Sequence, residues 1–329
     1  MVSVAMCTYN GANYIEEQLL SIFGQTKYVD EIVICDDQST DDTVGLIRHL
    51  AERSPGRIRL FINEERLHVS ANFEKAILLC KGDFIFLSDQ DDVWHANKVE
   101  TLCNWLFLHP DKDVVFSNTR IVDKKGKPLT EKTLFDISGL DEKALKWFDD
   151  GLAPEMFLYV CRAGGLTMAM RKSFVPKIRV RRDVWKVALG AIHDESIALC
   201  AIGYNKLGYC NEVLMDYRLH GDNSEGMGIG FNTVFKNPNP YRAFFIDMNR
   251  YGEFPDSLIQ RAEFINLRYQ SRYKNGFKLL INNTINGKYR SIYGNKAWRF
   301  FFWDLYDYYI HLASRVVLKF KKKGNQETV

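Results

Sequence analysis

Several kinds of protein are excluded by what this sequence of 329 residues has little of. It contains 22 glycines and 8 prolines, which is too few for a collagen-like or low-complexity chain. No run of about 18 apolar residues occurs, so we expect no membrane-spanning helix. Residues 2–7 read directly as a strand without a basic segment before them, and we expect no secretory signal there.

The seven cysteines form no pattern of a metal site or a disulfide framework. They are scattered and odd in number, and no CxxC pair with metal-site spacing occurs. We therefore expect reduced, mostly buried thiols in a cytoplasmic protein.

Charge is distributed unevenly along the chain, although the net charge is only +3. Residues 231–329 contain 17 Lys and Arg against 7 Asp and Glu, and 22 of the 44 aromatic residues. Residues 1–230 contain 27 basic residues against 34 acidic ones. This split favours an acidic front part that uses a cation and a back part that meets anions, a membrane or a partner protein. No known RNA- or DNA-binding motif occurs, so we expect no nucleic acid partner.

The first 120 residues alternate short β-branched runs with amphipathic stretches, which predicts βαβ units around a parallel sheet. The expected strands are 2–7, 31–35, 57–62, 83–87 and 113–116, and the expected helices are 13–24, 41–51, 69–80 and 96–108. Weaker patterns predict a strand over 162–170, a helix over 192–202 and a strand over 208–217. The expected fold is therefore α/β, and ligands are expected beyond the carboxyl ends of the strands.

Three polar clusters follow the first, second and fourth expected strands, at 8–11, 36–43 and 88–92. Parallel strands place all three at one sheet edge. In the second cluster, Asp41 and Asp42 are explained by the first turn of a helix capped at Ser39 or Thr40. Asp37 precedes that cap, and a carboxylate there can accept the imide N–H of a pyrimidine base.

The third cluster places Asp89 and Asp91 two residues apart, on one side of an extended segment. Together with Asp92 they offer hard oxygen ligands to Mg²⁺ or Mn²⁺, which also bind phosphate oxygens. The alternative is that Asp92 only begins a helix.

These three clusters together resemble family 2 of the glycosyltransferases, which have the GT-A fold, over roughly residues 1–225. Later segments agree with the family pattern: Gly164-Gly165, His193-Asp194-Glu195 and Tyr217–Asn223. The last of them, together with the SDQDDxW form of 88–94, is similar to the bacterial rhamnosyltransferase-like branch.

The resemblance implies a UDP- or dTDP-linked sugar donor and a nucleotide-sugar site. It assigns the base and ribose to Thr8, Tyr9 and Asn10, the base N3–H to Asp37, the ribose or sugar to Asp89, and the donor sugar to Gly164 and Gly165. Tyr9 could instead be a core aromatic residue. Arg218 could pair with phosphate in this site or brace an acidic residue.

The resemblance also implies inverting transfer with one general base, for which Asp194 is the candidate. A helix N-cap is the alternative for Asp194. In this branch aromatic residues usually follow the base, but here Glu195 and Ser196 follow Asp194, so Glu195 is a competitor for the role of base. Asp91 is assigned to a divalent metal, Mn²⁺ or Mg²⁺, and His220 to the metal or the diphosphate.

The C-terminal part is expected to be a flexible loop at 226–240 and a helical extension at 241–329. An aromatic stripe over 296–320 and a polybasic end at 319–323 fit the surface of an anionic membrane. Packing on the catalytic domain or on a second subunit fits equally well, so a homo-oligomer is a further possibility.

The sequence thus predicts transfer of a sugar, with rhamnose favoured, to a hydroxyl of a glycan or polyprenyl-diphosphate-linked acceptor in bacterial surface polysaccharide synthesis. One alternative is a nucleotidyltransferase, although the absence of Lys and Arg from 8–13 counts against it. The other is a non-catalytic subunit that binds sugar nucleotides.

Overall fold

The computed structural model of this chain describes residues 1–153, 163–179 and 193–221. All of them belong to the first of two compact units, which comprises residues 1–244. The expected loop at 226–240 and the expected helices at 241–329 lie outside the described residues.

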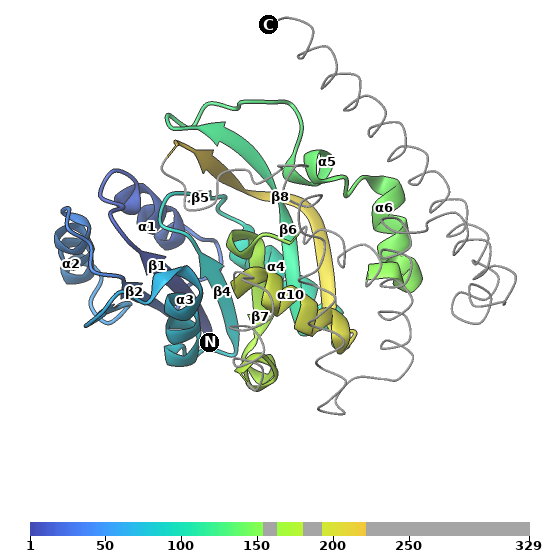
Figure 1. The fold of residues 1–329 in the computed structure, drawn as a ribbon, viewed down its shortest axis with the longest axis horizontal. Coiled ribbons are helices and arrows are strands. Elements are labelled where there is room, and N and C mark those ends of the chain that lie inside the picture. The colour runs from blue at the N-terminus through green and yellow to red at the C-terminus, as the bar shows by residue number, and fades with distance from the viewer. Residues whose placement is uncertain (154–162, 180–192, 222–329) are drawn as a thin grey trace, which may run out of the picture. The chain divides into compact units, whose positions relative to one another are not determined.

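The described strands form one eight-stranded sheet in the order β3-β2-β1-β4-β7-β6-β8-β5 (Figure 1). Their bounds are β1 Val2–Thr8, β2 Glu31–Asp36, β3 Ile58–Ile62, β4 Phe84–Ser88, β5 Val93–Trp94, β6 Val114–Asp123, β7 Met168–Arg171 and β8 Leu207–Leu219. The first four neighbours, β3, β2, β1 and β4, are parallel. β7 is antiparallel to both β4 and β6, β8 runs parallel to β6, and β5 pairs antiparallel with β8. The mostly parallel α/β sheet expected from the sequence is confirmed.

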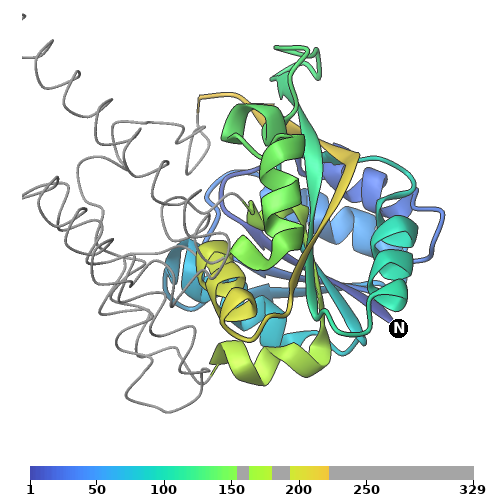
Figure 2. The ribbon, with the colours of Figure 1, turned by 90° about the vertical axis from the view of Figure 1, so that its right-hand side faces the viewer.

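Helices cover both faces of the sheet. The longer ones are α1 Ile15–Phe23, α2 Thr43–Arg53, α3 His68–Leu79, α4 Lys98–Leu108 and α10 His193–Gly203, and the short ones are α5 Leu134–Ser138, α6 Glu142–Trp147 and α8 Val175–Arg179. Figure 2 shows α3, α6 and α10 on one side of the sheet and α1, α2 and α4 on the other. The sheet is therefore the middle of three layers.

The core follows from the apolar periodicity. β1 and β2 are buried along nearly their whole length, as expected for parallel strands covered on both faces. Ile15, Leu19 and Ile22 recur at helical spacing and form the fully buried stripe of α1. They belong to the same apolar cluster as Val4 and Ile32 of the sheet. This packing anchors the strands whose ends carry the polar clusters.

The structure corrects four details of the sequence interpretation. The expected strand over 162–170 is confirmed only at its end, where β7 begins at Met168; residues Gly165–Thr167 before it form a 3₁₀ turn, in which Thr167 bonds back to the Gly164 carbonyl. β6 does not end at 116 but continues to Asp123. The short strand β5 has no counterpart among the expected strands. Helix α2 begins at Thr43 and not near Ser39, so Asp42 is its N-cap residue, without a side-chain capping bond.

Candidate active site

The carboxyl ends of β1, β2 and β4 lie side by side, as the sequence predicts. Thr8 at the end of β1 is in register with Asp36 at the end of β2, and Met6 is in register with Ser88 at the end of β4. The three polar clusters therefore meet at one sheet edge, which is where α/β sheets bind ligands.

Several side chains of the first two clusters hold the loops themselves. Asp36 is fully buried and accepts hydrogen bonds from the Thr8 hydroxyl at 2.7 Å and from the Ser39 hydroxyl at 2.6 Å. Asn10 adopts a positive φ of 51° and accepts a bond from the Thr40 amide at 2.8 Å. Asp41 accepts from the Thr43 amide, as a residue at a helix start does. Thr8 and Asn10 thus join the loops after β1 and β2.

Asp37 lies in a cradle of donors from the segment that follows β3. Its Oδ1 accepts from the Leu67 amide at 2.7 Å and from the Asn63 side chain at 2.9 Å, and its Oδ2 accepts from the His68 amide at 3.0 Å. Burial alone would raise the pKa of Asp37, but these bonds and nearby Arg66 outweigh it and lower the pKa. The carboxyl is therefore held as a carboxylate in a fixed orientation.

Tyr9 is not a core residue, because 37% of it is exposed. The guanidinium of Arg66 lies 3.7 Å from the centre of its ring, and Arg66 Nε is 3.6 Å from Oδ2 of Asp37. The Gln90 side chain accepts from the Tyr9 amide at 2.9 Å and donates to the Tyr9 carbonyl at 3.0 Å. An exposed flat ring thus stands beside a fixed carboxylate, with an arginine between them.

Asp194 lies near Asp89 and Asp91, although more than 100 residues separate it from them along the chain. Burial raises the pKa of Asp89 to about 7, and repulsion from Asp91 and Asp194 adds to the effect. Asp91 and Asp194 therefore both lie close enough to Asp89 to repel its charge.

Asp91 and His220 form the candidate metal pair. Nε2 of His220 lies 2.8 Å from Oδ2 of Asp91, and the Tyr14 ring stacks on the imidazole at 4.5 Å between centroids. A carboxylate and an imidazole are donor types that suit Mn²⁺. The part of the chain that the structure describes contains no group of three or more His, Cys, Asp or Glu side chains placed to hold a metal. The pair therefore fits part of a metal site, which phosphate oxygens and water would complete.

Arg218 is 3% exposed and braces the acidic loop. Its Nε donates to the Asp91 carbonyl at 2.9 Å, and its guanidinium also pairs with Glu17 at 2.6 Å. Its amide donates to Asp92 Oδ1 at 3.2 Å. Of the two roles expected for Arg218, this geometry matches the bracing of acidic residues.

Asp194 lies in the first turn of α10, where the helix dipole favours a negative charge. Its Oδ2 accepts from the Gly165 amide at 2.8 Å, and its Oδ1 accepts from the Glu195 amide at 2.7 Å. The residue is 9% exposed. The glycine pair and the acidic segment predicted from the sequence are thus in direct contact.

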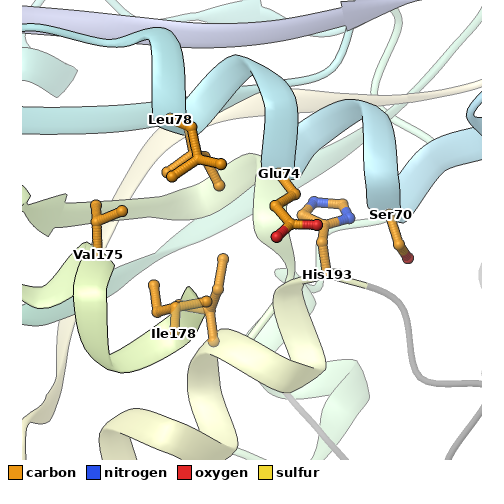
Figure 3. Close-up of a pocket in the computed structure, with 8 residues that line it drawn as sticks. Ser70, Glu74, Leu78, Val175, Ile178 and His193 are labelled. Atoms are coloured by element: carbon orange, nitrogen blue, oxygen red, sulfur yellow. The ribbon is translucent and has the colours of Figure 1, made fainter. Parts of the chain in front are cut away.

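His193 lines a pocket between α3, α8 and α10 (Figure 3). Its ring stacks on Phe73 at 3.9 Å between centroids, and the residue is 7% exposed. Within the described residues neither of its ring nitrogens has a hydrogen-bond partner. Burial lowers its pKa, so the imidazole is neutral. Figure 3 shows Ser70 and Glu74 at the same end of the pocket and aliphatic side chains, among them Leu78 and Ile178, at the other.

Three residues of this edge are not evident from the sequence. Gln90 lies inside the acidic motif, yet its identity alone does not reveal that it binds the Tyr9 main chain. Arg66 comes from a loop without a pattern. Lys98 is fully buried at the start of α4. The one sign of it in the sequence is that a basic residue stands in the first turn of an expected helix, where the helix dipole disfavours cations.

The mixed, mostly parallel sheet matches the GT-A fold expected from the sequence, and sequence comparison identifies the family. The family described as "Glycosyl transferase family 2" matches residues 3–175, just over half of the chain. The chain therefore belongs to glycosyltransferase family 2 and is a glycosyltransferase (EC 2.4).

Several bacterial relatives share part of this sequence. The Mycobacterium tuberculosis protein Rv1520 is 31% identical over 127 residues, and the chain spans only 37% of its length. The dTDP-rhamnosyl transferase RfbG of Shigella flexneri is 27% identical over 236 residues, which are 70% of this chain and 77% of that protein. The Escherichia coli UDP-Glc:alpha-D-GlcNAc-diphosphoundecaprenol beta-1,3-glucosyltransferase WfgD is 31% identical over 38% of this chain and 50% of its own.

Two solved structures share the fold at low identity. Staphylococcus aureus TarS 1-349 in complex with UDP-GlcNAc gives a TM-score of 0.54 at 15% identity, covering 88% of this chain and 78% of that one. The mannosyltransferase PcManGT of Pyrobaculum calidifontis, in complex with GDP-Man and Mn²⁺, gives 0.51 at 17% identity, covering 95% and 86%. These similarities confirm the GT-A expectation.

Proposed function

We propose that this enzyme is an inverting, metal-dependent transferase that moves a sugar from a UDP- or dTDP-linked donor to a hydroxyl group of a glycan or lipid-linked acceptor. The observation that carries the proposal is that Asp194, held by the Gly165 amide at 2.8 Å, and Asp91 are both close enough to Asp89 to repel its charge. A single displacement at the anomeric carbon requires one general base near the metal-bound donor, to remove the proton of the acceptor hydroxyl.

The donor's base is proposed to bind between Tyr9 and Asp37. Asp37 is ionised and oriented by three donors, so it can accept the imide N–H of uracil or thymine through its Oδ2 side. Arg66 occupies the space between Asp37 and the Tyr9 ring, so the incoming base would have to displace it. Asp89 is proposed to contact the ribose or the sugar, and Gly164 and Gly165 the sugar.

Asp194 is proposed as the general base. Its two oxygens each accept one amide hydrogen bond, which fixes the plane of the carboxylate and leaves further lone pairs for the acceptor hydroxyl. As the acceptor oxygen bonds to the anomeric carbon, its proton passes to Asp194 and the nucleoside diphosphate leaves from the opposite side. His193, neutral and adjacent, offers the acceptor a hydrogen-bonding group.

Asp91 and His220 are proposed to hold Mn²⁺ or Mg²⁺, with the donor's diphosphate supplying further ligands. When bound, the ion neutralises charge that develops on the departing diphosphate. Arg218 keeps the loop of Asp91 in place from behind.

The acceptor and cellular role rest on the relatives. RfbG and WfgD are by name a dTDP-rhamnosyl transferase and an enzyme acting on a diphosphoundecaprenol-linked sugar. They support rhamnose as the transferred sugar and a polyprenyl-diphosphate-linked acceptor in surface polysaccharide synthesis. Among the described residues, every helix is too short or too polar to span a membrane. We propose a cytoplasmic enzyme whose C-terminal region 241–329 contacts the membrane surface or a second copy.

A panel of UDP- and dTDP-sugars, each with and without Mn²⁺, tests the proposal by thermal shift and by release of nucleoside diphosphate with acceptor. Ligands that bind the native state raise the melting temperature according to their affinity. We expect one donor to stabilise the protein only with the metal and to be turned over. Stabilisation without any turnover across acceptors would favour a non-catalytic binding subunit, and release of pyrophosphate from a sugar phosphate and nucleoside triphosphate would favour a nucleotidyltransferase.

A further inference from the structure

Lys98, the first residue of α4, places its amine in the protein interior, within electrostatic reach of Asp92 and Asp89. The side chain is fully buried. Its Nζ donates to the Leu166 carbonyl at 2.7 Å and to Sδ of Met215 at 3.2 Å, and it lies 4.1 Å from the centre of the Trp94 ring. The amine thus joins the start of α4 to β5, to β8 and to the turn before β7.

Attraction to the nearby carboxylates of Asp92 and Asp89 offsets only part of the cost of placing a lysine there. Burial of an amine is costly, and a cation at a helix N-terminus opposes the helix dipole. An apolar side chain of the same length would avoid both costs at Lys98. The position is better explained by the carbonyl group that the amine binds.

That carbonyl belongs to the turn that orients the proposed base. The turn spans Gly164 to Thr167 and is closed by the Thr167 amide and hydroxyl, which donate to the Gly164 carbonyl at 3.0 and 2.7 Å. Within it, the Gly165 amide donates to Oδ2 of Asp194 at 2.8 Å. One short turn is therefore held by Lys98 at its Leu166 carbonyl and itself holds Asp194.

We propose that Lys98 is a positioning residue: by binding the Leu166 carbonyl, its buried amine holds the Gly164–Thr167 turn where the Gly165 amide orients the Asp194 carboxylate. The proposal rests on the proposed role of Asp194 for its effect on catalysis, but not for its effect on the turn. An ammonium group and a neutral amine both donate hydrogen bonds, so the contact persists in either protonation state.

The test compares Lys98→Met with a matched control, Lys172→Met. Lys172 also donates to a main-chain carbonyl, that of Lys81 at 3.1 Å, but it is exposed and follows the far end of β7. Amide hydrogen exchange of the full-length protein, followed by mass spectrometry over residues 163–168, reads the turn without needing activity. We expect exchange of the Gly165 amide to be at least 5-fold faster in Lys98→Met and unchanged in Lys172→Met.

Kinetics provide the second measurement. We expect kcat to fall at least 10-fold in Lys98→Met, with the donor's KM within 3-fold of wild type, because a displaced base slows the reaction without weakening donor binding. A purely structural role would lower the melting temperature while leaving kcat of the folded enzyme unchanged. A folded Lys98→Met with wild-type exchange at 163–168, or with wild-type kcat, would overturn the proposal.

If Lys98→Met does not fold, Lys98→Gln gives the same decision. It keeps a polar side chain but ends one atom short of the position of Nζ, so the bond to the Leu166 carbonyl is lost or weakened. Faster exchange of Gly165 with a kcat-specific loss supports the proposal, and wild-type values overturn it. A wild-type protein that transfers no sugar would defeat the proposed function, while the exchange measurement still decides whether Lys98 holds the turn.

Discussion

The Gly165 amide donates to Oδ2 of Asp194 at 2.8 Å, and the same glycine leaves no room for a β-carbon. A Cβ added at Gly165 would lie 2.7 Å from Nε2 of His193 and 3.0 Å from Cβ of Asp194. Glycine is thus required here by close packing against the start of α10. The neighbouring Gly164 has no such constraint, since its nearest added contact would be the Leu166 side chain at 3.9 Å.

This difference predicts opposite outcomes for two adjacent substitutions. Gly165→Ala must push His193 and Asp194 away, so we expect at least a 10-fold loss of kcat and a loss of stability of about 1–3 kcal/mol, typical of overpacking. Gly164→Ala should keep wild-type stability, because its added carbon meets only the Leu166 side chain at 3.9 Å, and any smaller loss of activity should appear in the donor's KM, because Gly164 is assigned to the donor sugar. Steady-state kinetics and thermal unfolding of the two variants make the comparison. Equal activity of the two would contradict the described contact.

The metal pair predicts that cation binding depends on the donor. Only Asp91 and His220 are assigned to the ion, so we expect Mn²⁺ to bind the free protein weakly and to bind much more tightly once UDP or dTDP adds phosphate oxygens. Titration calorimetry with and without nucleotide measures this. Asp91→Asn should raise the Mn²⁺ concentration for half-maximal activity at least 10-fold, whereas the exposed control Asp111→Asn should not change it. Unchanged metal dependence in Asp91→Asn would remove Asp91 from the site.

The cradle of Asp37 predicts a pH dependence of stability. Burial alone would raise the pKa of Asp37, but in the folded protein the donors and Arg66 lower it below the ordinary value of 3.8. The ionised form therefore stabilises the fold above that value, and this contribution is lost as the pH falls through the folded pKa. We expect Asp37→Asn to lower the free energy of unfolding by a constant amount between pH 5 and 8, and by less below about pH 4. Urea unfolding measures both variants, and a difference that does not shrink in acid would show that Asp37 acts through shape alone.

The sheet edge could be predicted because its signals are local. Alternating apolar runs mark β1, β2 and β4, and polar residues follow each of them directly, so parallel pairing alone brings 8–11, 36–43 and 88–92 together.

The contacts that orient the site could not be predicted in this way. Gly165 and Asp194 are 29 residues apart, and Lys98 and Leu166 are 68 apart. Both contacts depend on β7 inserting antiparallel between β4 and β6, a pairing that no periodicity reveals. The turn at Gly164–Thr167 was not predicted either, because its two glycines permit both a strand and a turn.

The charge of Asp194 is the quantity on which the proposed mechanism depends. Asp194→Asn keeps the size of the side chain and removes the proton acceptor, and Glu195→Gln does the same for its competitor. The decisive measurement is the transfer rate of both variants at saturating donor and metal, with donor binding measured in parallel. We predict a loss of about 10²–10⁴-fold in kcat for Asp194→Asn with donor affinity retained, and near wild-type turnover for Glu195→Gln. Wild-type turnover by a folded Asp194→Asn, or the larger loss in Glu195→Gln, would contradict the assignment of the base.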